Sequence, residues 1–145
     1  MTCHIIEQPL SPWQAIAEYE ANISPKGKFG ATATFIGTMR DFNDESTVSG
    51  MTLSHYPAMT DQYLDKLTEQ AKKKWPLIDV LLIHRVGDIK PAEPIMLIAC
   101  WSAHRRASLD ACQWLIEALK QQAPFWKKET RPDGSRWVDT NTDGH

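Results

Sequence analysis

The chain has 145 residues, 42% of them hydrophobic and 23% charged, which is typical of a soluble globular protein and excludes an intrinsically disordered one. Its formal net charge of −2 argues against a generally basic nucleic-acid-binding protein. The three cysteines cannot all pair, the N-terminus lacks a signal-peptide pattern, and no apolar run is long enough to span a membrane. We therefore expect one domain over residues 1–145, with a disordered tail from about residue 140, in a reducing, cytoplasmic compartment.

The first third of the chain predicts a strand, a helix and a second strand. Residues 3–8 suit a short strand, and Ser11 followed by Pro12 predicts the start of a helix that runs to about residue 22. Threonine, isoleucine and phenylalanine are frequent between residues 30 and 39, which favours a strand. The polar stretch 40–49 lacks periodicity, and we expect it to be an irregular, mobile loop.

The middle of the chain predicts a strand at 51–56, after which Pro57 leads into a helix from about Ala58 to Trp75. That helix carries a hydrophobic residue at every fourth position, and we expect the resulting stripe to be buried: Met59, Tyr63, Leu67, Ala71 and Trp75. Residues 78–86 and 95–101 are nearly continuous apolar runs, as in central strands covered on both faces. The segment 87–94 between them has the composition of a turn.

The last third predicts a helix over 105–122 and then a hairpin that turns at residues 132–134. The helix face expected to be buried consists of Leu109, Cys112, Ile116 and Leu119. Hairpins mix with helical crossovers along the whole chain. The order therefore favours an α+β fold with a mixed, mainly antiparallel sheet and helices packed on it.

Cations are concentrated toward the C-terminus. Between His104 and Trp137 there are four anions against seven cations: Arg105, Arg106, Lys120, Lys127, Lys128, Arg131 and Arg136. Such asymmetry indicates either an anionic ligand or a solvated helix face. The pair His104–Arg105 stands where a strand gives way to a helix, whose N-terminal N–H groups attract anions, although ordinary capping and surface charge explain it equally well.

Familiar catalytic motifs are missing: the sequence has no dinucleotide-binding or P-loop glycine pattern, no paired-cysteine or HExxH metal motif and no nucleophile elbow. Lys127 follows an Ala-Pro-Phe-Trp segment. Aromatic neighbours can desolvate a lysine and lower its pKa, or they can simply cover its stem. Lys120 falls in the last turn of the predicted helix, where a cation also stabilises the helix dipole.

Several segments in consistent order resemble the large, catalytic subunits of molybdopterin synthase. The longest is APFWKKETRPDGSRWVD, at residues 123–139, preceded by SAHRRASLDACQWLIEALK at 102–120. FIGTMRDFN, LSHYPAMT and IHRVGDI, earlier in the chain, are similar to the same family. The resemblance runs from about residue 30 to residue 139 and is far more specific than one short motif.

This resemblance implies a sulfurtransferase of molybdenum cofactor biosynthesis with an α/β-hammerhead fold. The expected substrate is cyclic pyranopterin monophosphate (precursor Z), which gains two sulfurs as the dithiolene of molybdopterin. Sulfur is expected from the thiocarboxylate on the C-terminal Gly-Gly of a small ubiquitin-like subunit, so that no permanently bound cofactor is needed. Two large and two small subunits would form a heterotetramer around a large-subunit homodimer. Neither nucleic acid nor membrane is expected as a partner.

The resemblance also implies the site residues. Lys120 and Lys127 match the active-site lysines, and no metal ligand is implied. The residues expected to bind substrate are Thr38, Met39, Arg40, His104, Arg105, Lys120, Lys127, Lys128, Glu129 and Arg136. No cysteine lies in the matched catalytic segments as a sulfur carrier. Two other functions use the same cations: a non-catalytic module that binds an acidic or Gly-Gly protein tail, and a phosphate-ester enzyme that needs no protein partner.

Overall fold

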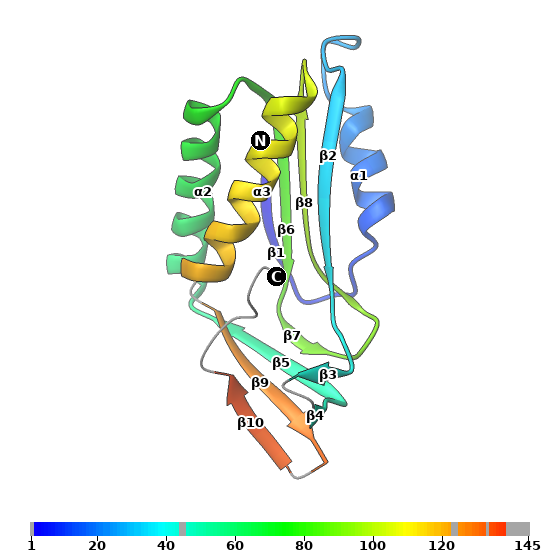
Figure 1. Cartoon of the computed structure of the whole chain (residues 1–145), viewed down its shortest axis with the longest axis vertical. Helices are drawn as coiled ribbons and strands as arrows, with labels where there is room; N and C mark the ends of the chain where they lie inside the picture. Colours follow the sequence, from blue (N-terminus) through cyan, green and yellow to red (C-terminus); the bar gives the residue numbers. More distant parts are fainter. Residues whose placement is uncertain (1, 44–45, 123–124, 133, 139–145) are drawn as a thin grey trace.

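The structure is a computed structural model that describes residues 2–43, 46–122, 125–132 and 134–138. Three helices and ten strands make up this part of the chain (Figure 1). In chain order they are β1 (Thr2–Ile6), α1 (Pro12–Ala21), β2 (Ala31–Thr38), β3 (Phe42–Asn43), β4 (Ser46–Thr47), β5 (Gly50–His55), α2 (Pro57–Lys74), β6 (Leu77–Arg85), β7 (Gly87–Ile89), β8 (Pro94–Ser102), α3 (Arg105–Gln122), β9 (Phe125–Arg131) and β10 (Gly134–Val138). The tail predicted to be disordered lies outside the described residues.

The strands form two four-stranded sheets rather than one. The first has the order β1-β6-β8-β2, in which only β1 and β6 are parallel, and the second is the antiparallel sheet β10-β9-β5-β7. Figure 1 shows the second sheet crossing below the end of the first. The predicted α+β class with mainly antiparallel strands is therefore confirmed, but the predicted single sheet is divided in two.

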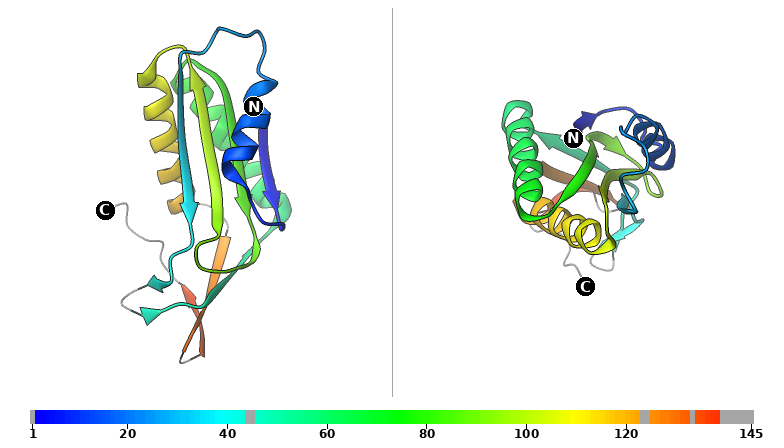
Figure 2. Two further views of the ribbon diagram at one scale, coloured as in Figure 1. Left: turned by 90° about the vertical axis from the view of Figure 1, so that its right-hand side faces the viewer. Right: turned by 90° about the horizontal axis from the view of Figure 1, so that it is seen from above.

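Helices cover both faces of the first sheet, as the apolar runs in β6 and β8 predict. Successive residues of a strand point to opposite faces. Leu82 and Ile98 accordingly pack in the core shared with α2 and α3, whereas Leu81 and Leu97 pack in the core beneath α1. Figure 2 shows α2 and α3 on one side of this sheet and α1 on the other.

Two residues expected in buried helical stripes are exposed. Met59 in α2 and Leu109 in α3 are each 57% exposed. The α2 series has a strict four-residue spacing, which advances about 40° beyond each helical turn, so its first member Met59 lies off the face that the core covers. Leu109 lies at one edge of the face formed by the other members of the α3 series. Leu67 and Ala71 of the predicted stripe are buried as expected, and the other buried residues of α2 are Thr60, Leu64 and Thr68.

Two segments predicted as turn or loop contain paired strands. Phe42–Asn43 and Ser46–Thr47 pair as β3 and β4, and Gly87–Ile89 pairs with β5 as β7. Strands of two or three residues are too short for sequence periodicity to reveal. The anchor of the polar stretch is Val48, which is 2% exposed and belongs to a third core cluster: Met39, Val48, Met51, Leu53, Val86 and Ile89.

The predicted C-terminal hairpin is confirmed as β9 and β10, although residue 133 of its turn lies outside the described residues. β9 also pairs with β5, so that Lys127 stands opposite Leu53 on one side and Val138 on the other. This pairing fixes the start of β9 close to the C-terminal end of α3. It places side chains from distant parts of the chain next to one another.

Candidate active site

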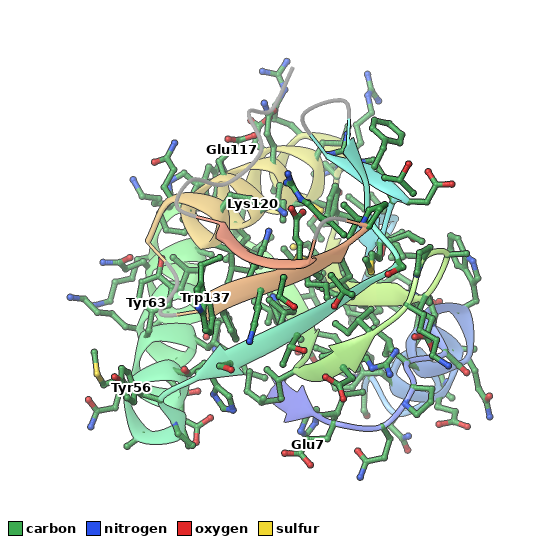
Figure 3. All side chains as sticks on the ribbon, turned by 90° about the horizontal axis from the view of Figure 1, so that it is seen from below. Glu7, Tyr56, Tyr63, Glu117, Lys120 and Trp137 are labelled. Atoms are coloured by element: carbon green, nitrogen blue, oxygen red, sulfur yellow. The ribbon has the colours of Figure 1, made fainter. Side chains whose placement is uncertain are left out.

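The C-terminal end of α3 and the start of β9 bring two lysines together. Lys120 lies in the last turn of α3, and Lys127 is the third residue of β9. Both side chains are half-buried, and their amino groups are close enough to hydrogen-bond to each other. Figure 3 shows Lys120 at the end of α3 beside the hairpin strands. Two amines in this contact cannot both carry a proton without strong repulsion.

Burial lowers the pKa of both lysines, because a charged amine loses hydration in the protein interior. For Lys127 the pKa falls to about 8, since the charge of Lys120 and the hydrogen bond between the two amines add to the effect of burial. The carboxylate of Glu129 partly opposes this shift. An appreciable fraction of Lys127 is therefore uncharged near neutral pH, while the hydrogen bond to Lys127 partly opposes the lowering of the Lys120 pKa.

Arg40 is the third cation of this cluster. It follows β2, is exposed to solvent, and places its guanidinium over the ring of Phe42, with 4.8 Å between the Cζ atom and the ring centroid. Its positive charge also lowers the pKa of Lys120 and of Lys127. The structure thus brings together Arg40, Lys120 and Lys127, which are separated by up to 87 positions in the sequence.

The two predicted site residues that precede Arg40 differ in their surroundings. Thr38 is exposed at the end of β2, beside an irregularity in its pairing with β8. Met39 is only 6% exposed, and its side chain packs in the third core cluster. Its backbone N–H donates to the carbonyl of Glu93, and its own carbonyl accepts from Ala92. Met39 therefore anchors the chain that presents Arg40, and its side chain faces the core.

The predicted residues on the hairpin also divide. Lys128 is exposed and lies over the ring of Trp137, whereas Glu129 is 6% exposed. Because side chains alternate along a strand, Glu129 shares the face of Lys127 and Lys128 points away from it. The backbone of Arg136 pairs with that of Glu129 in β10. The side chain of Arg136 lies outside the described part of the structure.

His104 and Arg105 are at the opposite end of α3 from the lysines. Both are exposed beside the N-terminus of the helix, where Ser102 Oγ accepts a hydrogen bond of 3.1 Å from the N–H of Ser108. Arg105 and Lys120 are fifteen positions apart, which corresponds to about 22 Å along a helix. One copy of the chain therefore does not place His104 and Arg105 in the same pocket as the lysines.

Sequence reasoning missed His84 of β6, which lies beneath the lysines. Its Nδ1 is 2.8 Å from the carbonyl oxygen of Arg85, and its ring stacks on Phe125 with 4.1 Å between centroids. Burial lowers the pKa of His84 to about 4, and the charges of Lys120 and Lys127 add to this shift. The imidazole is therefore neutral at physiological pH. The signal in the sequence was a histidine within an otherwise apolar strand, a pattern that more often marks a core residue.

The remaining reactive groups lie elsewhere. All three cysteines are free, and Cys100 and Cys112 are buried in the core between the first sheet and α3. A hydrogen bond between these two thiols, together with burial, raises the pKa of Cys100. A cavity of about 420 Å³ lies beside α1 and is lined by residues that include Glu20, Lys26 and Phe29.

Within the described residues, no group of three or more histidine, cysteine, aspartate or glutamate side chains is placed to hold a metal ion. The helices of the same part of the chain include none that is both long and apolar enough to cross a membrane. The cluster of Arg40, Lys120 and Lys127 thus has the chemistry of an anion site that also contains an uncharged amine.

Comparison with known proteins shows which family the chain belongs to. Residues 5–122 match the protein family described as MoaE protein. The chain belongs to the MoaE family. The molybdopterin synthase catalytic subunit of Pseudomonas aeruginosa is 48% identical over 110 residues, which are 76% of this chain and 73% of that protein. The resemblance seen in the sequence is confirmed, and the chain is a catalytic subunit of this sulfurtransferase of molybdenum cofactor biosynthesis.

Solved structures agree with this assignment. A molybdopterin biosynthesis MoaE protein from Burkholderia ambifaria superimposes with a TM-score of 0.79 at 39% identity, covering 99% of this chain and 92% of that one. The fold is also shared with one chain of a structure described as a protein–protein complex of subunits 1 and 2 of molybdopterin-converting factor from Helicobacter pylori. That chain has a TM-score of 0.79 at 21% identity, over 94% of this chain and 90% of its own. The MoaE match ends at residue 122, so the lysine in β9 lies beyond it.

Proposed function

We propose that this chain transfers sulfur from the C-terminal thiocarboxylate of a small ubiquitin-like subunit to cyclic pyranopterin monophosphate, forming the dithiolene of molybdopterin. The observation that carries the proposal is the contact between Lys120 and Lys127, in which burial favours one charged and one uncharged amine. Sulfur transfer needs a cation for developing negative charge and an acceptor for a proton. The lysine pair offers both within one site.

The two lysines take different roles. The thiocarboxylate sulfur first bonds to a carbon of the substrate, and water then adds to the acyl carbon of the partner tail. That carbon becomes tetrahedral, its oxygen gains negative charge, and the ammonium of Lys120 stabilises the oxyanion; its collapse breaks the acyl–sulfur bond, leaving the sulfur on the substrate and a carboxylate on the partner. Lys127, whose pKa is about 8, accepts a proton in its uncharged form or positions the substrate. Sulfur comes from the partner and not from this chain, which the burial of Cys100 and Cys112 supports.

The substrate phosphate requires donors outside the lysine pair. Arg40 is exposed beside the lysines and offers the planar, charge-assisted donors that suit a phosphate. His104 and Arg105 have the same chemistry but lie about 22 Å from Lys120 in one copy of the chain. We therefore propose that a second copy of the chain, in a homodimer, contributes its His104 and Arg105 to the site.

A small subunit completes the proposed assembly. The Helicobacter pylori structure is described as a complex of subunits 1 and 2, which supports a small protein partner for this chain. Two large and two small subunits give a heterotetramer, and the Gly-Gly tail of each small subunit reaches one lysine pair. The three free cysteines support a reducing compartment, which the cytoplasm provides.

Reconstitution tests this function directly. The chain is mixed with a thiocarboxylated small subunit and precursor Z, and dithiolene product is measured. Lys120→Ala and Lys127→Ala are expected to abolish turnover while the small subunit still binds, and near-normal activity in both variants would refute the assigned roles. Turnover without the thiocarboxylated subunit would indicate a phosphate-ester enzyme. Partner binding without any product from the unaltered chain would indicate a non-catalytic module.

A further inference from the structure

A line of alternating charge runs along one face of β9. Residues two apart on a strand share a face, so Lys127, Glu129 and Arg131 point to the same side. Glu129 and Arg131 are 6% and 7% exposed, and Lys127 is half-buried. A carboxylate therefore stands between two cations where water screens poorly. The protonation of Lys127 therefore depends on whether this carboxylate binds Arg131 or Lys127.

Glu129 is bound to Arg131. Its Oε1 accepts one hydrogen bond of 3.1 Å from Nε of Arg131 and a second, shorter one from Nη2. Toward Lys127 the same carboxylate acts through its charge, which raises the pKa of that amine against the larger lowering caused by burial and by Lys120. The contact with Arg131 thus competes with a direct ion pair between Glu129 and Lys127.

We propose that Arg131 is a positioning residue for the reaction, because it holds the Glu129 carboxylate on its own side of the strand and prevents capture of Lys127 as a lysine–glutamate ion pair. The inference rests on the proposed role of Lys127 as an uncharged amine. An arginine suits this position because its rigid fork places two N–H groups on one carboxylate, whereas a lysine offers a single point of charge.

The other charged and titratable groups around Lys127 come from different elements. They are Lys120 on α3, Arg40 after β2, His55 on β5 and His84 on β6, and His84 is neutral because its pKa is about 4. Arg136 stands opposite Glu129 in β10. An exchange at Arg131 leaves all five in place. Its effect on Lys127 therefore reports on the position of Glu129.

The first experiment follows the titration of Lys127 by NMR in protein labelled with carbon-13 at lysine, with Lys127→Arg to assign the signal. Arg131→Gln is expected to raise the pKa of Lys127 by up to about one unit, because the carboxylate of Glu129 loses both hydrogen bonds from Arg131 and can turn toward the ammonium. The acid limb of the kcat profile moves by the same amount. At pH 7 the rate falls by up to about tenfold and recovers at higher pH, which a general loss of structure would not produce.

A double-mutant cycle tests whether the effect passes through Glu129. Glu129→Gln is expected to lower the pKa of Lys127, and adding Arg131→Gln to that variant is expected to change it little. Arg131→Lys should restore only part of the unaltered behaviour. The matched control is Lys90→Gln, which removes an exposed cation just after β7 and should leave the Lys127 titration unchanged.

Two results would overturn the inference: an unchanged Lys127 titration in Arg131→Gln, or an equal shift with and without Glu129. If Arg131→Gln does not fold, Arg131→Lys decides, since an unchanged Lys127 pKa in that variant would also overturn it. The titration requires no substrate. A chain that forms no dithiolene would contradict the proposed function, while the NMR result would still decide the role of Arg131.

Discussion

The two ends of α3 carry similar charges in opposite surroundings. At its N-terminal end His104 and Arg105 are exposed, whereas at its C-terminal end Lys120 is half-buried against Lys127. Exposed basic side chains can attract or bind an anion. Cations forced together out of water lose charge readily, and this makes one of them a proton acceptor. Surroundings, rather than residue type, separate a binding group from a reacting one.

The largest expected effect on turnover comes from giving the C-terminal end of α3 a permanently charged group, as at its N-terminal end. Lys127→Arg keeps a cation in place but removes the uncharged form, because a guanidinium stays protonated. We expect turnover to fall about a thousandfold, measured as dithiolene formed in a single turnover with thiocarboxylated partner. Lys120→Arg keeps the charge that Lys120 supplies and should lose much less. Comparable activity in the two variants would contradict the division of roles.

The pH dependence of the free energy of unfolding tests whether the region around the lysines, where His84 is buried, excludes water. Its pKa is about 4 in the folded chain, below the ordinary 6.5, so the unfolded state binds a proton first as the pH falls. Stability is complete above pH 6.5 and decreases toward pH 4 by about 3 kcal/mol. Urea unfolding of His84→Phe should lack this part of the pH dependence. His4→Phe, at an exposed position, should retain it, and identical pH curves for His84→Phe and the unaltered chain would contradict the prediction.

The exposed N-terminal end of α3 should contribute to turnover only at the site of a second copy of the chain. Arg105→Ala is expected to lower turnover about tenfold to a hundredfold, because charged hydrogen bonds to the substrate phosphate are lost. When Arg105→Ala and Lys127→Ala chains are mixed and allowed to exchange, roughly a quarter of the sites in a twofold dimer should regain all their residues. Recovery of turnover on mixing supports the shared site. A mixture no more active than its components would contradict it.

The middle of α3 should matter least for the reaction. Cys112 faces the core there, against Cys100, and neither thiol is near the lysine pair. Replacing all three cysteines by alanine is expected to keep kcat within about twofold in the folded variant, because these side chains pack as small hydrophobic groups. Thermal unfolding verifies the fold of the variant. Loss of chemistry in a folded triple variant would require a sulfur carrier on this chain.

Sequence alone predicted the three helices, the long strands and the C-terminal hairpin, because each depends on local patterns of apolar and turn residues. It also indicated Lys120 and Lys127 by resemblance, and it suggested that aromatic neighbours could desolvate Lys127. It did not predict that β5 would leave the first sheet to pair with β9. The short strand β7 depends on its distant partner β5, and β3 and β4 are each only two residues long, too short for a periodic pattern in the sequence.

The site residues divide in the same way, into those that sequence patterns indicate and those that only contacts in the folded chain reveal. His84 and Arg131 could not be recognised, because their importance comes from stacking on Phe125 and from binding Glu129 in the folded chain. His104 and Arg105 were expected in one pocket with the lysines, and helix length places them at the other end of α3. Residue type and family resemblance identify which groups carry charge. Only the folded structure, in which Lys120 at the end of α3 meets Lys127 of β9, shows which of those groups has its pKa lowered.

The pairing of β5 with β9 has a consequence for how the protein is made. Leu53 pairs with Lys127, so this part of the second sheet closes only after the intervening helices and strands have left the ribosome. Contacts between such distant positions are entropically costly and form late. The first sheet and its three helices are complete by residue 122. The lysine pair therefore forms in a late step of folding, on a first sheet whose four strands include neither β5 nor β9.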